Sequence, residues 1–166
     1  VLAGLGLALF LASSTALSTP LLAQEPDAVA FDFDSFSARL KAMATEEFAP
    51  AKVDLPKAFQ NLDYDAYRLI QYRDEASKWA GDPSFYRLQA FHLGWLYNEP
   101  VKVFEIEDGR AVPIQFQPSD FDYHNAAIGE AAAAGTFPGV AGIRVNFPLN
   151  RPDAIDELVT FLGASY

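Results

Sequence analysis

The stretch FYRLQAFHLGWLYNEPVKVFEIEDG, residues 85–109, indicates the fold most clearly. Its first eight residues alternate with the two-residue period of a β-strand, with one face formed by Tyr86, Leu88, Ala90 and His92. Asp108-Gly109 is a strong hairpin signal, because both residues tolerate positive φ. Residues 101–107 and 110–117 are therefore predicted to be strands. With the first strand they are expected to form an antiparallel meander.

Short helices are predicted on the N-terminal side of this region. A helix is expected from Ser35 to about Thr45, with Asp34 as its cap. Its apolar side chains recur at helical spacing, at Phe36, Leu40 and Met43. Residues 56–59 are predicted to form a single turn, and residues 63–70 another short helix.

The C-terminal part mixes both signals. Residues 125–134 are alanine-rich and predict a helix, and residues 143–147 alternate as a strand. A last helix is predicted after Asn150 or Arg151, ending at Gly163. Its apolar positions fit a helical face: Ile155, Leu158, Val159 and Leu162. The final three residues resemble the start of a strand, so the domain is expected to continue beyond Tyr166.

Composition excludes several classes of protein. The chain has 166 residues, 12 Lys+Arg against 22 Asp+Glu, a net charge of −10 and no Cys. A nucleic-acid binder needs a basic face, and docking on anionic lipid also needs positive charge. Without Cys there are no thiolate metal sites, thiol catalysis or disulfides. Residues 24–166 are long enough for one domain with a real core.

Residues 1–23 carry no charge and read as an export signal. The apolar run VLAGLGLALFLA, residues 1–12, is too short to span a bilayer, which needs about 20 residues. Small polar residues and Pro20 follow, and cleavage is predicted after Ala23. A buried or membrane helix is the alternative. The missing Met and charged start indicate an incomplete N-terminus, so Sec and Tat export both stay open. No stable membrane anchor is expected after cleavage, and a Cys-free exported chain fits a bacterial periplasm.

Two acidic segments allow chemistry but favour simpler interpretations. Residues 120–124, DFDYH, offer two carboxylates and an imidazole for a metal, although a solvated turn is favoured. Glu105 and Glu107 share one face of a strand and allow an acid/base pair, although an exposed strand face is favoured. No metal site and no cofactor are predicted.

Aromatic residues are dense around the first strands, including Trp95 and Tyr97. Sugar sites place flat rings against the apolar faces of pyranoses, while carboxylates and amides hold the hydroxyls. Trp95, Tyr97 and His92 are therefore candidate substrate-binding residues. The alternative is that the aromatics build a β core. For His92, which shares a strand face with Leu88 and Ala90, that alternative is a core histidine with a satisfied hydrogen bond.

Four segments resemble one family, the periplasmic glucan biosynthesis proteins of the G and D type (OpgG/OpgD, also called MdoG/MdoD). They are FDFDSFSARLKAMA (31–44), YDAYRLIQYRDEASKW (64–79), FYRLQAFHLGWLYNEPVKVFEIEDG (85–109) and AGIRVNFPLNRPDAIDELVTFLGASY (141–166). Each motif alone is modest, but the ordered set is specific and covers nearly all of residues 24–166.

The resemblance implies an exported Gram-negative protein of the periplasm that helps to make osmoregulated, β-1,2-linked glucans. Family members are much longer and carry a large N-terminal β-sandwich, similar to galactose mutarotase, and a C-terminal immunoglobulin-like domain. The fold is therefore expected to be mainly β, with residues 24–166 as the N-terminal part of that antiparallel β-sandwich and a few short helices. Some D-type members are similar to inverting β-1,2-glucanases. Their catalytic carboxylates correspond to positions beyond Tyr166, so none is assigned here.

Three functions remain open for the whole protein: an enzyme that trims or branches the glucan backbone, a non-catalytic glucan-binding protein, and an assistant of the membrane glucosyltransferase. A β-glucan polysaccharide is the expected partner in the first two, and the glucosyltransferase in the third. A pair of carboxylates placed for acid and base work would favour the enzyme. The 166-residue chain alone is predicted to release no oligosaccharide from linear β-1,2-glucan.

Overall fold

A computed structural model describes residues 28–49, 53–81 and 83–163. The predicted signal segment, residues 1–23, and its cleavage position after Ala23 lie outside these described residues. Within the described ranges, no helix is both long and apolar enough to cross a membrane.

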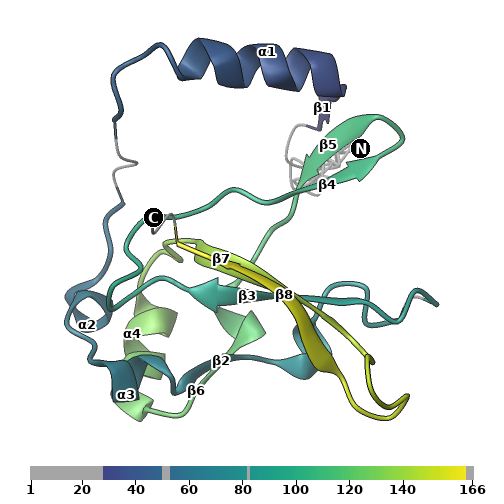
Figure 1. Cartoon of the computed structure of the whole chain (residues 1–166). Coiled ribbons are helices and arrows are strands. Elements are labelled where there is room, and N and C mark those ends of the chain that lie inside the picture. Colours follow the sequence, from purple (N-terminus) through teal and green to yellow (C-terminus); the bar gives the residue numbers. More distant parts are fainter. Residues whose placement is uncertain (1–27, 50–52, 82, 164–166) are drawn as a thin grey trace, which may run out of the picture.

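The strands of the described residues form three antiparallel sheets (Figure 1). The largest has the order β3 (Arg87–His92), β7 (Val140–Phe147) and β8 (Asp156–Leu162). A second sheet has the order β1 (Val29–Ala30), β5 (Arg110–Pro113) and β4 (Phe104–Glu107). The third pairs β2 (Ile70–Tyr72) with β6 (Phe121–Tyr123). The predicted mainly β fold with a few short helices is confirmed.

The α-helices of the described chain are short, and polar side chains cap three of the four. They are α1 (Phe33–Met43), α2 (Lys57–Gln60), α3 (Tyr64–Tyr67) and α4 (Ala126–Ala134). Single 3₁₀ turns lie between strands, at Asp74–Ala76 and Pro118–Asp120. The side chain of Asn125 accepts from the N–H groups of Ala127 and Ile128, which fixes the start of α4. The side chain of Asp63 caps α3 in the same way, accepting from Ala66 N at 2.8 Å.

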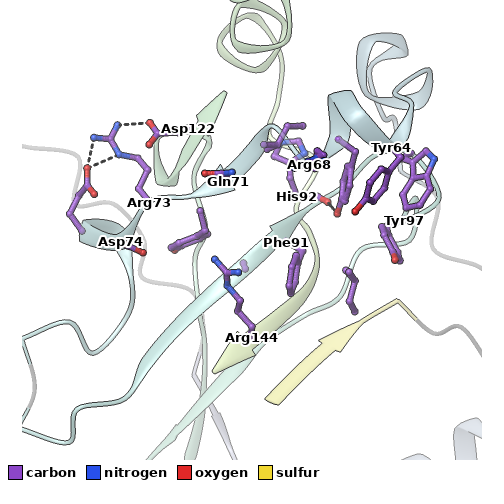
Figure 2. Close-up of a pocket in the computed structure, with 17 residues that line it drawn as sticks. Tyr64, Arg68, Gln71, Arg73, Asp74, Phe91, His92, Tyr97, Asp122 and Arg144 are labelled. Atoms are coloured by element: carbon purple, nitrogen blue, oxygen red, sulfur yellow. Dashed lines mark hydrogen bonds and ion pairs between the residues drawn. The ribbon is translucent and has the colours of Figure 1, made fainter. Parts of the chain in front are cut away.

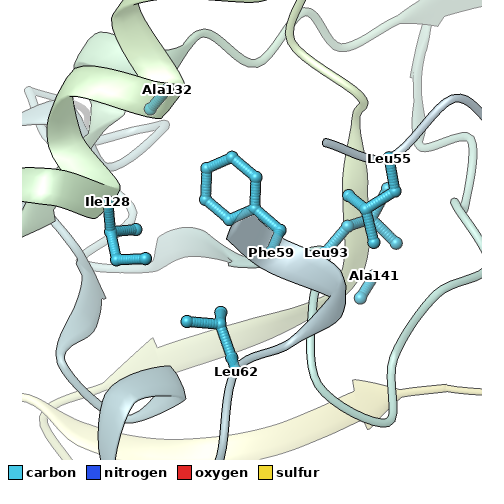
Figure 3. Packing of buried hydrophobic residues seen from close by; sticks show 7 residues of the cluster. All are labelled: Leu55, Phe59, Leu62, Leu93, Ile128, Ala132 and Ala141. Carbon is cyan, nitrogen blue, oxygen red and sulfur yellow. The ribbon is translucent and has the colours of Figure 1, made fainter. Parts of the chain in front are cut away.

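The core lies where the helices α2 and α4 meet the main sheet (Figure 3). Its first cluster consists of Leu55, Phe59, Leu62, Leu93, Ile128, Ala132 and Ala141. A second cluster, formed by Tyr72, Ala90, Phe121 and Val140, lies between the main sheet and the β2–β6 pair. The His92 ring joins the two clusters, because it stacks on Phe59 at 4.6 Å and meets Phe121 edge-on at 5.1 Å.

The β1–β5–β4 sheet and α1 stand at the edge of the molecule, away from the main sheet (Figure 1). No residue of α1 is buried, and its apolar face is formed by Phe33, Phe36, Leu40 and Met43. The described part of the chain therefore buries its core under α2 and α4, and leaves α1 with its apolar face exposed.

The predicted three-strand meander is wrong. The Asp108-Gly109 hairpin joins β4 to β5 as expected, but β3 pairs with β7 rather than with β4. The chain turns away after β3 because Gly94 and Trp95 both have positive φ, 146° and 56°. Val101 N then donates to Val140 O at the start of β7, and β4 begins only at Phe104.

The predicted C-terminal helix is also wrong, because that segment is β8. Arg151 to Ala154 form a turn, in which Ala154 N donates to Arg151 O at 3.2 Å, and Asp156 onward pairs with β7. Three of the apolar residues that match a helical face, Leu158, Val159 and Leu162, also fit a strand. The segment favours extended backbone, because Val159 and Thr160 are β-branched. Pairing of the whole of β8 with residues 142–147 of β7 decides between the two.

Smaller differences concern element ends. Asp32 caps α1, accepting from Ser35 N at 2.9 Å, so the helix begins two residues before the predicted start. The helix predicted over residues 63–70 is the single turn α3, and Ile70 already belongs to β2. The predicted turn of α2, the helix α4 and the strand at residues 143–147 are confirmed.

Candidate functional site

A groove of about 680 Å³ crosses the main sheet at the end of β3 (Figure 2). Side chains from α3, β2, β3, β7 and the loop after β3 line it. Aromatic rings, among them Tyr64 and Tyr97, occupy one end, and Arg73 and Asp122 occupy the other. Phe91 and Arg144 lie between the two ends (Figure 2).

The aromatic end is a cluster of four rings, formed by Tyr64, Tyr67, Trp95 and Tyr97. The Trp95 centroid lies 5.5 Å from that of Tyr64 and 5.8 Å from that of Tyr97. Tyr67 lies 5.9 Å from Trp95 and 5.6 Å from Tyr97. Aromatic pairs at such distances attract each other, so the rings support one another's positions. Trp95 and Tyr97 remain partly exposed in the groove.

The backbone of the loop after β3 fixes the position of Trp95. Gly94 and Tyr97 bond to each other in both directions, at 2.8 and 2.9 Å, and Trp95 N donates to Phe59 O at 3.1 Å. A Cβ on Gly94 would lie 3.1 Å from that same carbonyl oxygen, and its φ of 146° is unfavourable for other residues. The sequence L-G-W-L-Y at residues 93–97 therefore holds the tryptophan against α2 and α3.

The charged end is organised by Arg73. Its guanidinium bonds to Glu75 at 2.6 Å and lies 3.7 Å from Asp122 (Figure 2). The hydrogen bond from Arg73 lowers the pKa of Glu75 below its usual value. Glu75 is therefore ionised near neutral pH and suited to accept hydrogen bonds, rather than to donate a proton as a general acid.

His92 is buried beneath the groove, with 2% of its surface exposed. Burial lowers the pKa of its imidazole to about 4, although the Leu93 carbonyl, 2.6 Å from Nδ1, opposes that shift. Its Nε2 has no hydrogen-bond partner among the described residues. The carbonyl oxygen of His92 accepts from the Tyr67 hydroxyl at 2.9 Å, so the residue helps to position one ring of the cluster.

The structure brings Trp95, Tyr97 and His92 to one groove, but in different surroundings. Trp95 and Tyr97 line it with their rings, whereas the His92 ring packs against core aromatics. Its role in substrate binding stays a prediction. Its burial agrees with the alternative of a core histidine with a satisfied hydrogen bond at Nδ1, but Nε2 has no partner among the described residues. Three further residues of the groove, Tyr64, Tyr67 and Arg144, were not among the binding residues predicted from the sequence. The aromatic run of residues 64–72 was the available signal for the two tyrosines.

Carboxylates of the two acidic segments, residues 120–124 and Glu105 with Glu107, contact other side chains of the protein. Residues 121–123 are the strand β6, not the predicted turn, and Asp122 faces Arg73. Glu105 is the acceptor for Trp79 Nε1 at 2.8 Å. Among the described residues, no group of three or more acidic or histidine side chains could hold a metal ion.

The fold and the groove define a class of protein: a mainly β chain with an aromatic and arginine-lined groove across its sheet. Comparison with known proteins narrows this class. The family model described as "Periplasmic glucan biosynthesis protein, MdoG" matches residues 31–166. The chain therefore belongs to the MdoG family of periplasmic glucan biosynthesis proteins.

Curated relatives carry a matching name. A "Glucans biosynthesis protein G" of Cereibacter sphaeroides is 42% identical over 95% of this chain and 31% of its own length. Proteins of the same name from Bradyrhizobium diazoefficiens and Pseudomonas syringae are 35% and 33% identical, over 93% and 82% of this chain and 31% and 21% of their own length. The chain thus spans about a third or less of the length of these relatives.

Proposed function

We propose that this chain is part of a periplasmic protein of glucan biosynthesis, and that its aromatic groove binds the glucan. The family and the names of the relatives support the pathway and the periplasmic location. The aromatic and polar lining of the groove supports the proposal that the glucan binds there. Export by Sec or Tat, with cleavage after Ala23, belongs to the same proposal and is checked by N-terminal sequencing of the exported protein.

One observation carries the proposal of a ligand: four aromatic rings gather beside arginine and amide side chains on one open surface. Flat rings such as Trp95 can stack on the C–H faces of a glucose unit. The guanidinium of Arg144 and the amide of Gln71, which also line the groove, can bond to hydroxyl groups. The guanidinium of Arg68 lies on the same wall.

Substitution of Trp95 tests this proposal in the whole protein, expressed from its complete reading frame. Trp95→Ala removes the largest ring of the groove. We expect it to weaken binding of a linear β-1,2-gluco-oligosaccharide by about 2 kcal/mol, roughly a 30-fold rise in Kd. Isothermal titration calorimetry measures the Kd, and circular dichroism checks that the variant is folded.

Trp79→Ala is the matched control, because Trp79 is the other tryptophan of the chain and does not line the groove. Its indole bonds instead to Glu105. The Kd of the control should stay within about twofold of the parent. Equal binding by the parent and by Trp95→Ala would overturn the proposal, and so would equal losses in the two tryptophan variants.

A further inference from the structure

A second, polar hollow of about 460 Å³ adjoins the aromatic groove on the same sheet. Asp74 and Arg144 line both, so the two hollows meet at these residues. The polar hollow continues past Gln89 and Asn146 towards Asp153 and Glu157. We call the two together the track.

The register of the main sheet aligns the two parts of the track. Gln89 on β3 lies opposite Arg144 on β7, and Arg87 lies opposite Asn146. Side chains two residues apart on a strand share a face, so Phe91, Gln89 and Arg87 follow one another along the same side of β3. The surface therefore runs from an aromatic row to two polar rows. Each step is about 7 Å, twice the rise per residue of a strand.

Gln89 organises the polar hollow from within. It is 3% exposed, and its Nε2 donates to Asp74 and to Ser77, both at 2.9 Å. Its Oε1 accepts from Arg144 Nε at 2.8 Å and from Asn146 Nδ2 at 3.2 Å. All four hydrogen-bonding positions of the amide are thus occupied by protein groups. Gln89 is a positioning residue, with no capacity left for a ligand.

Arg144 is held in place but keeps free donors. Its Nε is bonded to Gln89, and its guanidinium lies 5.7 Å from the centroid of the Phe91 ring. Among the described residues, no acceptor or carboxylate bonds to its two terminal nitrogens. A fixed guanidinium with unused N–H groups, placed where two hollows meet, is prepared to bind hydroxyl oxygens.

We propose that the track binds several consecutive sugar units of one linear glucan, with Arg144 gripping the unit at the junction. This inference rests on the proposed function, because it assigns the aromatic end to the first unit. It adds a second subsite, made of Asn146, Asp153 and Glu157, which the following units occupy. The protein therefore selects for the polymer over the single sugar.

Chain length provides the test. The whole protein is titrated with β-1,2-linked gluco-oligosaccharides of increasing length, from the disaccharide upward. We expect the affinity to rise at least tenfold between the disaccharide and chains long enough to reach Glu157, and then to level off. A Kd that does not change with length would overturn the proposal.

Two variants separate the parts of the track. Glu157→Gln alters the exposed far end, and we expect it to weaken binding of the longer chains severalfold while leaving the disaccharide unchanged. Arg144→Lys keeps the charge but loses the planar fork, and we expect at least a tenfold weaker Kd for the longer chains. Glu107→Gln, an exposed carboxylate on β4 outside both hollows, is the matched control and should bind like the parent.

The outcomes distinguish this inference from the function on which it rests. If Trp95→Ala weakens binding but Glu157→Gln and Arg144→Lys do not, the aromatic groove binds sugar alone and the second subsite is refuted. If no oligosaccharide binds to the folded parent protein, the proposed function fails, and the inference with it.

Discussion

The imidazole of His92 lies in an aromatic environment, with Phe59, Phe121, Tyr123 and Phe137 around it. None of these neighbours carries a charge that would stabilise a protonated ring. Burial therefore lowers its pKa from 6.5 to about 4. In the unfolded chain the ring takes up a proton near pH 6.5, so its neutral burial stabilises the fold above that pH. This stability is lost as the pH falls from about 6.5 to 4.

The folded protein should therefore lose stability in mild acid through His92. At pH 5 the loss is about 2 kcal/mol relative to pH 7.5, from the two pKa values. His92→Phe keeps an aromatic ring and cannot titrate, so we expect a smaller loss between these two pH values. Urea unfolding of the whole protein at both, followed by tryptophan fluorescence, measures the difference.

His124→Gln is the control for this experiment, because His124 is the other histidine of the chain and lies on the surface. Its unfolding free energy should fall between pH 7.5 and 5 as much as that of the parent. If His92→Phe shows the full loss as well, then titration of other groups explains the acid sensitivity, and His92 does not.

Residue type alone was enough to predict some of the side chains that line the groove. Trp95 and Tyr97 were predicted because wide aromatic rings are typical of sugar sites. Arg144 was not predicted, since only the pairing of β3 with β7 brings it to Gln89, 55 positions away in the chain. Tyr64 and Tyr67 lie on α3, and they meet Trp95 because the loop at Gly94 turns back towards that helix. No local pattern predicted the positive φ of this loop.

Among the described elements, β8 makes its main contacts with β7. Most of its side chains are exposed, including Leu158, Val159 and Phe161. Gly142 on β7 allows the close approach of the two strands. A Cβ at this position would clash with Phe161 O and lie 2.8 Å from Leu162 Cα, and these are backbone atoms that cannot rotate away.

Gly142→Ala should therefore separate β8 from β7. We expect a loss of about 3 kcal/mol in the free energy of unfolding, at the upper end of overpacking effects, because backbone must shift. Hydrogen exchange should become faster at the amides of residues 156–162, while α4 stays protected. Urea unfolding and exchange measured by mass spectrometry test both statements in the whole protein.

Gly129→Ala is the matched control, because Gly129 lies in the middle of α4 and a Cβ there meets Tyr123 Cβ at an ordinary 3.4 Å. Alanine is the better helix former, so this variant should be as stable as the parent or more stable, by up to about 1 kcal/mol. Unchanged stability of Gly142→Ala would contradict the tight β7–β8 approach.

Capping and turn residues predicted those elements well whose structure depends only on neighbouring residues. Asn125 before an alanine run, Pro56 before a single turn, and Asp108-Gly109 between two strands each specify their own structure. The choice of partner strand depends on distant residues instead. β3 pairs with β7 across a long stretch of chain, and β8 is a strand because β7 offers a free edge. Apolar residues on both faces of β8 carried no period that excluded a helix.

At the scale of the whole molecule, large apolar side chains remain exposed on several sides. Phe33 is 74% exposed and Phe48 78%, while Phe104 and Ile106 are about half exposed on the β4–β5 hairpin. Phe161 is 62% exposed on β8, at the opposite edge of the main sheet from β3. Separate apolar surfaces of this kind promote association with other chains, particularly beside an unpaired strand edge. Curated relatives are about three times as long, which gives them further chain to cover such surfaces.

The isolated 166-residue chain should therefore associate in solution, whereas the whole protein should not. We expect the isolated chain to bind the dye ANS, to scatter light at micromolar concentration and to melt without a sharp transition. Replacing exposed apolar residues at two of these places, as in Phe104→Lys with Phe161→Lys, should reduce the scattering, because lysine on a strand edge opposes pairing. Light scattering and calorimetry on the two chains measure this. A cooperative melt of a monodisperse isolated chain would contradict the prediction, since its exposed apolar faces would then be compatible with an independent fold.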